Sequence, residues 1–216
     1  MKFLLVTYND SDGVGQTVVN LNNNLNKLGH QSKIILLNKS TQEKNIIKVE
    51  RNRLKRFIYF PFEFLKKRFF DLFSFGNSTV DLKKIEEHVN KSDIIIIFTL
   101  HKFLSLDTIS KLFQKKKVIY FRPLDMELAT GGCHVNFIYK NGKECDKYLT
   151  GCNKCPKLNN FNLFNISNKI FERKKSFFDR FEPTILLENK FTKTFYDRSP
   201  VTKNAKNEVV YLPVRE

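Results

Sequence analysis

The sequence predicts an α/β fold in which parallel strands form a doubly wound, Rossmann-like sheet. Short, near-continuous apolar runs recur along the chain, as is typical of parallel strands buried on both faces. They alternate with segments of helical periodicity, and strand–helix–strand units of this kind are right-handed and parallel. With 216 residues, 41% of them hydrophobic, the chain can bury one substantial core or at most two small ones.

The first strand–helix–strand unit opens the chain. It consists of an apolar strand at 2–8, a polar loop containing Gly13 and Gly15, a helix, and a strand at 33–37. Gly29 stands where the C-terminal cap of the helix belongs. The helix is defined by apolar residues at helical spacing: Val18, Leu21, Leu25 and Leu28.

The glycine loop has two explanations. It lacks the third glycine of a dinucleotide-binding fingerprint, because position 18 is Val. A tight turn from strand to helix explains the glycines. Alternatively, backbone N–H groups at the helix start receive a hydroxyl or phosphate group of a substrate.

The rest of the chain continues the alternation of strands and helices. We expect about six parallel strands in a single domain spanning 1–216. Further strands are predicted at 46–49, 93–100, 117–121, 184–187 and 208–213. Helices are predicted at 80–89, 104–113, 167–181 and 189–196.

A basic aromatic segment at 51–75 interrupts this pattern. It interleaves Lys and Arg with phenylalanines, and Pro61 divides it, so we expect two short helices or one kinked helix. The formal net charge of +16 indicates an anionic partner. Three explanations fit: a helical insertion with a solvated basic face, contact with an anionic membrane surface, or binding of single-stranded nucleic acid. Nucleic acid is the least favoured, because no RNA-binding motif is present.

Two strand ends present side chains suited to a site. His101 follows the strand at 93–100, and Arg122 and Asp125 follow the strand at 117–121. Open α/β sheets bind ligands beyond the carboxyl ends of their strands. We therefore predict a ligand-binding site at this edge that includes His101, Arg122 and Asp125, although a histidine at a strand end is often an ordinary hydrogen-bonded residue.

All four cysteines of the chain gather in a knot at 131–158, with the pattern C-x11-C-x6-C-x2-C. A structural zinc ion explains this compact set best, because four thiolates complete a closed tetrahedron. Two disulfides or four free thiols are the alternatives. His134, beside the first cysteine, is interpreted as a polar surface residue or as a partner of a ligand. The predicted ligands are Cys133, Cys145, Cys152 and Cys155.

The same region resembles the signature of a group of bacterial family 4 glycosyltransferases, which read approximately HDM-x-x-x-TGGCH...C......C-x-x-CP-x-L. The continuation NKLGHQSKIILL, after the glycine loop, is similar to their usual ALGHEV. The residues that match the signature are Asp125, Met126, Thr130, Gly131, Gly132, Cys133, His134, Cys145, Cys152, Cys155, Pro156 and Leu158.

The resemblance implies the acceptor-side, N-terminal half of a two-domain GT-B enzyme. Such an enzyme transfers a hexosyl-type sugar, with retention, from a nucleotide-sugar to a glycan or lipid-linked acceptor in cell-surface polysaccharide synthesis. The resemblance implies His101 and Asp125 as the catalytic residues, which would touch the acceptor hydroxyl or the donor sugar. The implied substrate-binding residues are Gly13, Gly15, Arg122 and Thr130.

Three departures from the family pattern stand out. Leu124 occupies the position of the histidine before Asp-Met, and the serine-centred motif after a later strand is replaced at 187–190. We expect no C-terminal donor domain, which would bind the nucleotide-sugar, so this chain alone should be inactive unless a separate donor domain or chain completes it. The alternative is a non-enzymatic, zinc-containing basic module that binds nucleic acid or a membrane surface.

No secretory signal is recognisable at the N-terminus, since the apolar run after Met1 is short and is followed by Asn9 and Asp10. No stretch approaches the length of a membrane span. We expect a cytoplasmic protein, peripheral on the inner face of the membrane if the basic aromatic segment binds lipid.

Overall fold

The computed structural model describes residues 1–52, 57, 80, 82–100, 103–135, 137–138, 143–158 and 165–211. The chain divides into two compact units. Unit 1 comprises Met1–Phe60 and Gly76–Arg122, and unit 2 comprises Pro61–Phe75 and Pro123–Glu216.

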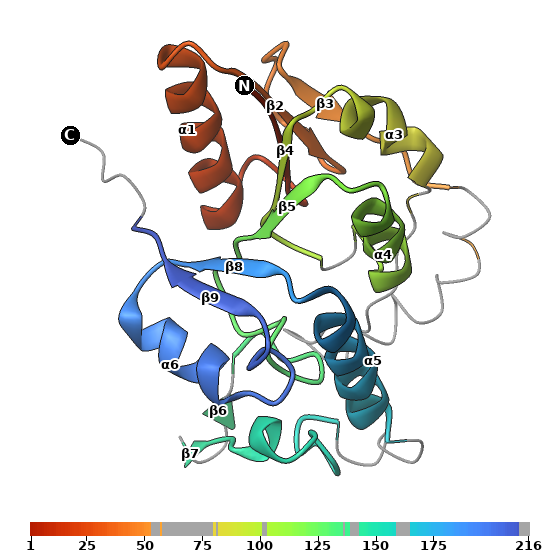
Figure 1. Ribbon diagram of the computed structural model, residues 1–216, viewed down its shortest axis with the longest axis vertical. Coiled ribbons are helices and arrows are strands. Elements are labelled where there is room, and N and C mark those ends of the chain that lie inside the picture. The colour runs from red at the N-terminus through yellow and green to blue at the C-terminus, as the bar shows by residue number, and fades with distance from the viewer. Residues whose placement is uncertain are drawn as a thin grey trace. The chain divides into compact units, whose positions relative to one another are not determined.

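Unit 1 is built on a parallel sheet with the strand order β3-β2-β1-β4-β5. From β1 the chain moves outward to β2 and β3, and then returns to the other side of β1 as β4 and β5 (Figure 1). This reversal is the topological switch point of a doubly wound fold. The strands are β1 (Lys2–Val6), β2 (Gln31–Leu36), β3 (Ile46–Lys48), β4 (Ile94–Ile97) and β5 (Val118–Phe121).

Helices cover both faces of this sheet. Right-handed crossovers require α1, between β1 and β2, to lie on one face and α3 and α4 on the other, and Figure 1 shows this arrangement. One face of the sheet packs on α1 through buried apolar residues of β1, β2 and β4. The helices are α1 (Gly13–Lys27), α3 (Leu82–Asn90) and α4 (Leu106–Gln114).

Unit 2 contains a strand–helix–strand unit of its own. The strands β8 (Thr184–Leu187) and β9 (Lys206–Val209) are parallel and are joined through α6 (Lys190–Arg198). The helix α5 (Ile166–Phe181) precedes β8. The cysteine-rich part of the chain holds the short antiparallel pair of β6 (Phe137–Ile138) and β7 (Lys143–Glu144) and a 3-10 turn, η1 (Lys147–Leu149).

The predicted fold class is confirmed: the structure is α/β and Rossmann-like, with parallel strands alternating with helices. The predicted last strand begins two residues earlier than expected, at Lys206, because its pairing with β8 and not its apolar content fixes its start. The β6–β7 pair was not predicted, since two-residue strands leave no periodic signal.

The basic aromatic segment at 51–75 lies almost entirely outside the described residues. Within the described part of the chain, no helix has the length and apolar content needed to cross a bilayer.

Candidate functional site

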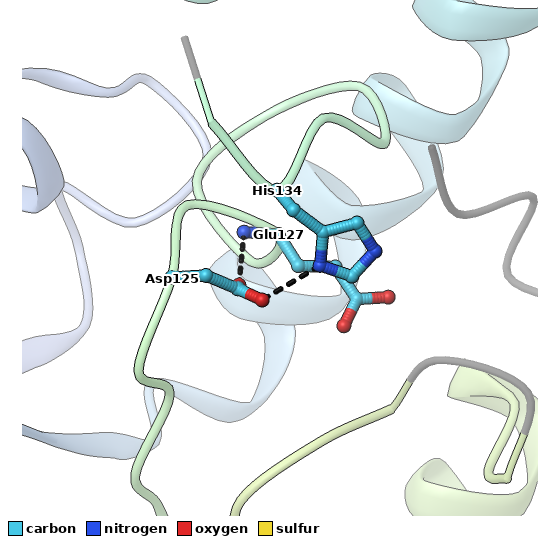
Figure 2. Close-up of side chains that lie close together, drawn as sticks. All are labelled: Asp125, Glu127 and His134. Carbon is cyan, nitrogen blue, oxygen red and sulfur yellow. Dashed lines mark hydrogen bonds and ion pairs between the residues drawn. The ribbon is translucent and has the colours of Figure 1, made fainter. Parts of the chain in front are cut away.

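The loop that follows β5 closes on itself through an aspartate and a histidine. Nδ1 of His134 lies 2.6 Å from Oδ2 of Asp125 (Figure 2). The backbone N–H of Met126 also donates to the carbonyl of His134 at 2.9 Å. The second carboxylate oxygen of Asp125 accepts the N–H of Glu127 at 2.7 Å. Since an ionised carboxylate only accepts, Nδ1 of His134 carries the proton of this bond. Both oxygens of Asp125 therefore serve to orient the loop and the imidazole.

A second carboxylate accompanies this pair. Glu127 is 4% exposed, and ligand atoms of Asp125, Glu127 and His134 all lie within 4.8 Å of one another. Figure 2 shows the three side chains converging from the two ends of the loop. The side chain of Asp125 is 35% exposed and that of His134 is 13% exposed, so water or a small ligand reaches the pair from the aspartate side.

A buried lysine neutralises part of this charge. Lys174, on α5, is 3% exposed, and its Nζ donates to the carbonyl oxygens of Glu127 and Thr130. Burial lowers the pKa of Lys174, and attraction to Glu127 and Asp125 offsets part of that effect. Two carboxylates thus face one buried ammonium group and one imidazole, and the charges balance when His134 is protonated.

The neighbouring carboxylates raise the pKa of His134. Burial by itself would lower the pKa of His134, but the hydrogen bond to Asp125 and the charges of Glu127 and Asp125 outweigh it and raise the pKa above its usual value of 6.5. A raised pKa favours the protonated imidazolium, and histidine is a common proton donor and acceptor in proteins. The arrangement can therefore act as a general acid or base, or present a positive charge to an anionic ligand.

Helix α6 and the turn after it hold the loop from the opposite side. The hydroxyl of the fully buried Tyr196 donates to the carbonyl of Asp125 at 2.7 Å, and the hydroxyl of Ser199 donates to the carbonyl of Ala129 at 2.7 Å. Together with Lys174, these bonds satisfy the carbonyl groups of a loop that forms no ladder. The position of the Asp125–His134 pair is thus fixed by α5 and α6.

The four cysteines line one pocket beside this loop. Cys133 ends the loop, Cys145 precedes η1, and the other two flank a tight turn with Cys152 in a left-handed conformation (φ 53°). Cys133 and Cys155 also pack on Leu158 and on α5. None of the four forms a disulfide.

Hydrogen bonds and burial set the thiol pKa values in opposite directions. The thiol of Cys133 donates to the sulfur of Cys155, and this contact, with backbone N–H groups of Lys157 and Leu158, lowers the pKa of Cys155 to about 6. The same contact raises the pKa of Cys133. Burial raises the pKa of Cys152 to about 11. The pocket therefore stabilises a thiolate at Cys155 first.

In unit 1, the glycine loop follows β1 at the switch point of the sheet. The N–H of Gly15 donates to Asp12 at 2.7 Å, so an aspartate of the chain itself caps the start of α1. A Cβ at Gly15 would lie 2.6 Å from the carbonyl oxygen of Asn9, whereas one at Gly13 would meet nothing within 4 Å. Gly15 is thus required by close packing of the turn. The substrate-binding role of both glycines stays a prediction.

The turn is anchored by a buried aspartate. Asp10 is fully buried and accepts hydrogen bonds from the backbone and hydroxyl groups of Ser40 and Thr41. Burial disfavours its charge, but the bonds from Ser40 and Thr41 prevail and lower its pKa to about 2. Asp10 thereby ties the glycine loop to the segment after β2.

The structure brings some of the predicted site residues together. Asp125 and Thr130 belong to one hydrogen-bonded loop in unit 2, where Thr130 donates to the carbonyl of Cys133 at 2.8 Å. Arg122 is 3% exposed and lies just after β5, where its N–H donates to Ile97. His101 lies outside the described residues, so its catalytic role stays a prediction.

Sequence reasoning missed two members of this site. Glu127 stands two residues after Asp125, a spacing that could have suggested a pair of carboxylates. Lys174 gives no such signal, because it stands beside Lys175 in a basic helix that resembles a solvated face. His134 was expected on the surface or beside a ligand, and the structure pairs it with Asp125.

The fold and the site define an α/β protein of Rossmann-like architecture with a carboxylate–histidine cluster. No protein-family model and no curated protein matches the chain. Among solved structures, the chain is similar to a short chain dehydrogenase family protein from Francisella tularensis subsp. tularensis SCHU S4. The identity is 12% and the TM-score 0.34, over 91% of this chain and 74% of that chain. A likeness of this degree assigns neither an activity nor a ligand.

Proposed function

We propose that this chain is the acceptor-binding half of a retaining GT-B glycosyltransferase of the family 4 type. The complete enzyme would transfer a sugar from a nucleotide-sugar to a glycan or lipid-linked acceptor. The observation that carries the proposal is the Asp125–His134 pair, because it joins the two ends of the DMELATGGCH stretch of the glycosyltransferase-like motif.

The interior of the motif supports the proposal as well. Thr130 bonds Cys133, and the N–H of Gly131 donates to the sulfur of Cys152 at 3.2 Å. A Cβ at Gly131 would lie 2.3 Å from the carbonyl oxygen of Ser167, so only glycine fits there. Each of these fixed residue types has a local physical reason, as expected if the motif is a functional structure and not a chance match.

The chemistry of the pair suits sugar transfer. In this reaction the acceptor oxygen bonds the anomeric carbon, the bond from that carbon to the phosphate oxygen breaks, and the hydroxyl proton is taken up by a base. His134, oriented at Nδ1 by Asp125 and with a raised pKa, has the properties of a group that hydrogen-bonds the reacting hydroxyl or accepts its proton. Asp125 would act mainly by positioning His134.

The other half of the reaction belongs to a donor domain. By resemblance, that domain binds the nucleotide-sugar, and this chain supplies the acceptor side. We therefore expect acceptor binding by this chain alone and sugar transfer only in the presence of a donor domain or chain.

Acceptor binding tests the proposal directly. Saturation-transfer NMR on this chain, with a panel of oligosaccharides and short-chain polyprenyl-diphosphate sugars, should identify a bound acceptor. Asp125→Asn and His134→Ala should weaken that binding at least about tenfold. Asp197→Asn, at an exposed position of α6 in the same unit, and His88→Ala, on α3, are the matched controls and should leave it unchanged. Binding that is insensitive to both site variants, or no binding by any sugar, contradicts the proposal.

The net charge of +16 favours a second part of the proposed function, in which the basic aromatic segment contacts an anionic membrane surface. Cosedimentation with vesicles that contain anionic lipid tests this membrane contact. Neutral substitutions of Arg53, Lys55, Lys66 and Lys67 should abolish vesicle binding, and unchanged binding would contradict the membrane contact. Salt-sensitive binding to RNA or DNA, without any affinity for sugars, would instead favour the non-enzymatic basic module.

A further inference from the structure

The four cysteines line one pocket in unit 2. We propose that it binds one zinc ion, with a structural and not a catalytic role. The ligands would be the sulfur atoms of Cys133, Cys145, Cys152 and Cys155.

Three separate pieces of the chain bring these sulfurs together. Cys133 comes from the end of the loop after β5, and Cys145 from the residues between β7 and η1. Cys152 and Cys155 flank a turn in which Gly151, Cys152 and Lys154 all have positive φ (94°, 53° and 47°). Left-handed backbone at two non-glycine residues is costly. A turn of this kind is expected where a bound ion stabilises it.

Backbone N–H groups point at the sulfurs, and this is the strongest support for thiolate ligands. Cys145 and Cys155 each accept a hydrogen bond from the N–H two residues ahead, at Lys147 and Lys157. The N–H of Gly131 likewise donates to the sulfur of Cys152 at 3.2 Å. Such donors stabilise charge on sulfur and are therefore suited to the deprotonated form that a metal binds.

Two lysines line the pocket and are held there. Nζ of Lys157 donates to the carbonyl of Val135 at 3.0 Å, and Nζ of Lys147 donates to the carbonyl of Asn153 at 3.2 Å. A zinc ion with four thiolates carries a net charge of −2, so two nearby ammonium groups would balance it. The charges of the pocket therefore fit the metal-bound state better than they fit four neutral thiols.

The geometry limits the function of the ion. Four sulfur ligands leave no position for water or substrate, which excludes a catalytic zinc. Among the described side chains, no three of these sulfurs lie within 4.8 Å of one another, whereas the ligand atoms of Asp125, Glu127 and His134 do. Zinc would thus have to draw the sulfurs inward, and the carboxylate–histidine cluster is the competing site.

Metal analysis separates these possibilities. The chain, purified under reducing conditions without added metal, should contain about one zinc per molecule by elemental mass spectrometry. Substitution with Co²⁺ should give the intense visible absorption of a tetrahedral site together with sulfur-to-metal charge transfer. Absence of metal, or a cobalt spectrum without sulfur charge transfer, overturns the proposal.

Two variants decide which cluster holds the ion. Cys145→Ser, at a partly exposed cysteine, should reduce the zinc content at least about tenfold and weaken the charge-transfer band, whereas His134→Ala should change neither. The reverse pattern would assign the metal to the carboxylate–histidine cluster. If Cys145→Ser fails to fold, a thiol titration of the unmodified chain replaces it: thiols should react only after chelation. Four oxidised cysteines without metal would contradict the proposal.

Discussion

Nδ1 of His134 donates to Oδ2 of Asp125 at 2.6 Å, and this bond closes the loop 125–134. Several carbonyl groups of the loop accept hydrogen bonds from side chains of α5, of α6 and of the turn after α6. The pair is reached by solvent from the aspartate side and backed by Glu127 and Lys174. It thus combines a rigid support with a titrating group, which is the arrangement that functional sites require.

The charge of His134 should make stability depend on pH. Its folded pKa is raised above the unfolded value of 6.5, so its contribution is complete below pH 6.5 and is lost as pH rises through the folded pKa. Thermal unfolding between pH 5.5 and 8.5 should therefore show a decline in the melting temperature of the wild type relative to His134→Gln. His88→Gln is the control and should follow the wild type. A constant difference between wild type and His134→Gln would show that this histidine does not titrate in that range.

Lys174 should be essential for the stability of unit 2. Lys174→Met leaves the carbonyl groups of Glu127 and Thr130 without donors and removes the cation that faces Glu127. We expect a loss of about 2 to 4 kcal/mol in the free energy of unfolding, measured by urea titration. Lys175→Met, at the neighbouring position where the lysine pairs with Asp179 on the surface, should leave the urea midpoint nearly unchanged. Equal effects of the two substitutions would refute the buried role of Lys174.

The two glycines of the N-terminal loop should respond differently to alanine. Gly15→Ala places a Cβ within 2.6 to 2.8 Å of Asn9 and Asp10, so the turn must shift at a cost of about 1 to 3 kcal/mol. Gly13→Ala has open space around its Cβ and should be neutral or slightly stabilising, since it begins α1. Urea unfolding of both variants measures this. A ligand-binding role for Gly13 would instead appear as lost acceptor binding at unchanged stability.

The fold class was predictable because its signal is local. The isoleucines of β4 form a continuous apolar run, and such a run has few alternatives to a strand buried on both faces. The Asp12 cap and the helical spacing of α1 are likewise set within one turn of the chain. The short β6–β7 pair was not predictable, because its pairing depends on the loop between its strands and not on its own residues.

The sequence by itself determined the α/β class and the gathering of all four cysteines and the Asp-to-His motif in one stretch. Only the tertiary structure decided which side chains meet. Lys174 bonds a carbonyl 47 residues away, and Tyr196 bonds one 71 residues away. Such contacts arise because buried polar groups need hydrogen-bond partners, and the partner is set by how the chain packs. Spacing along the sequence therefore does not predict which residue the partner is.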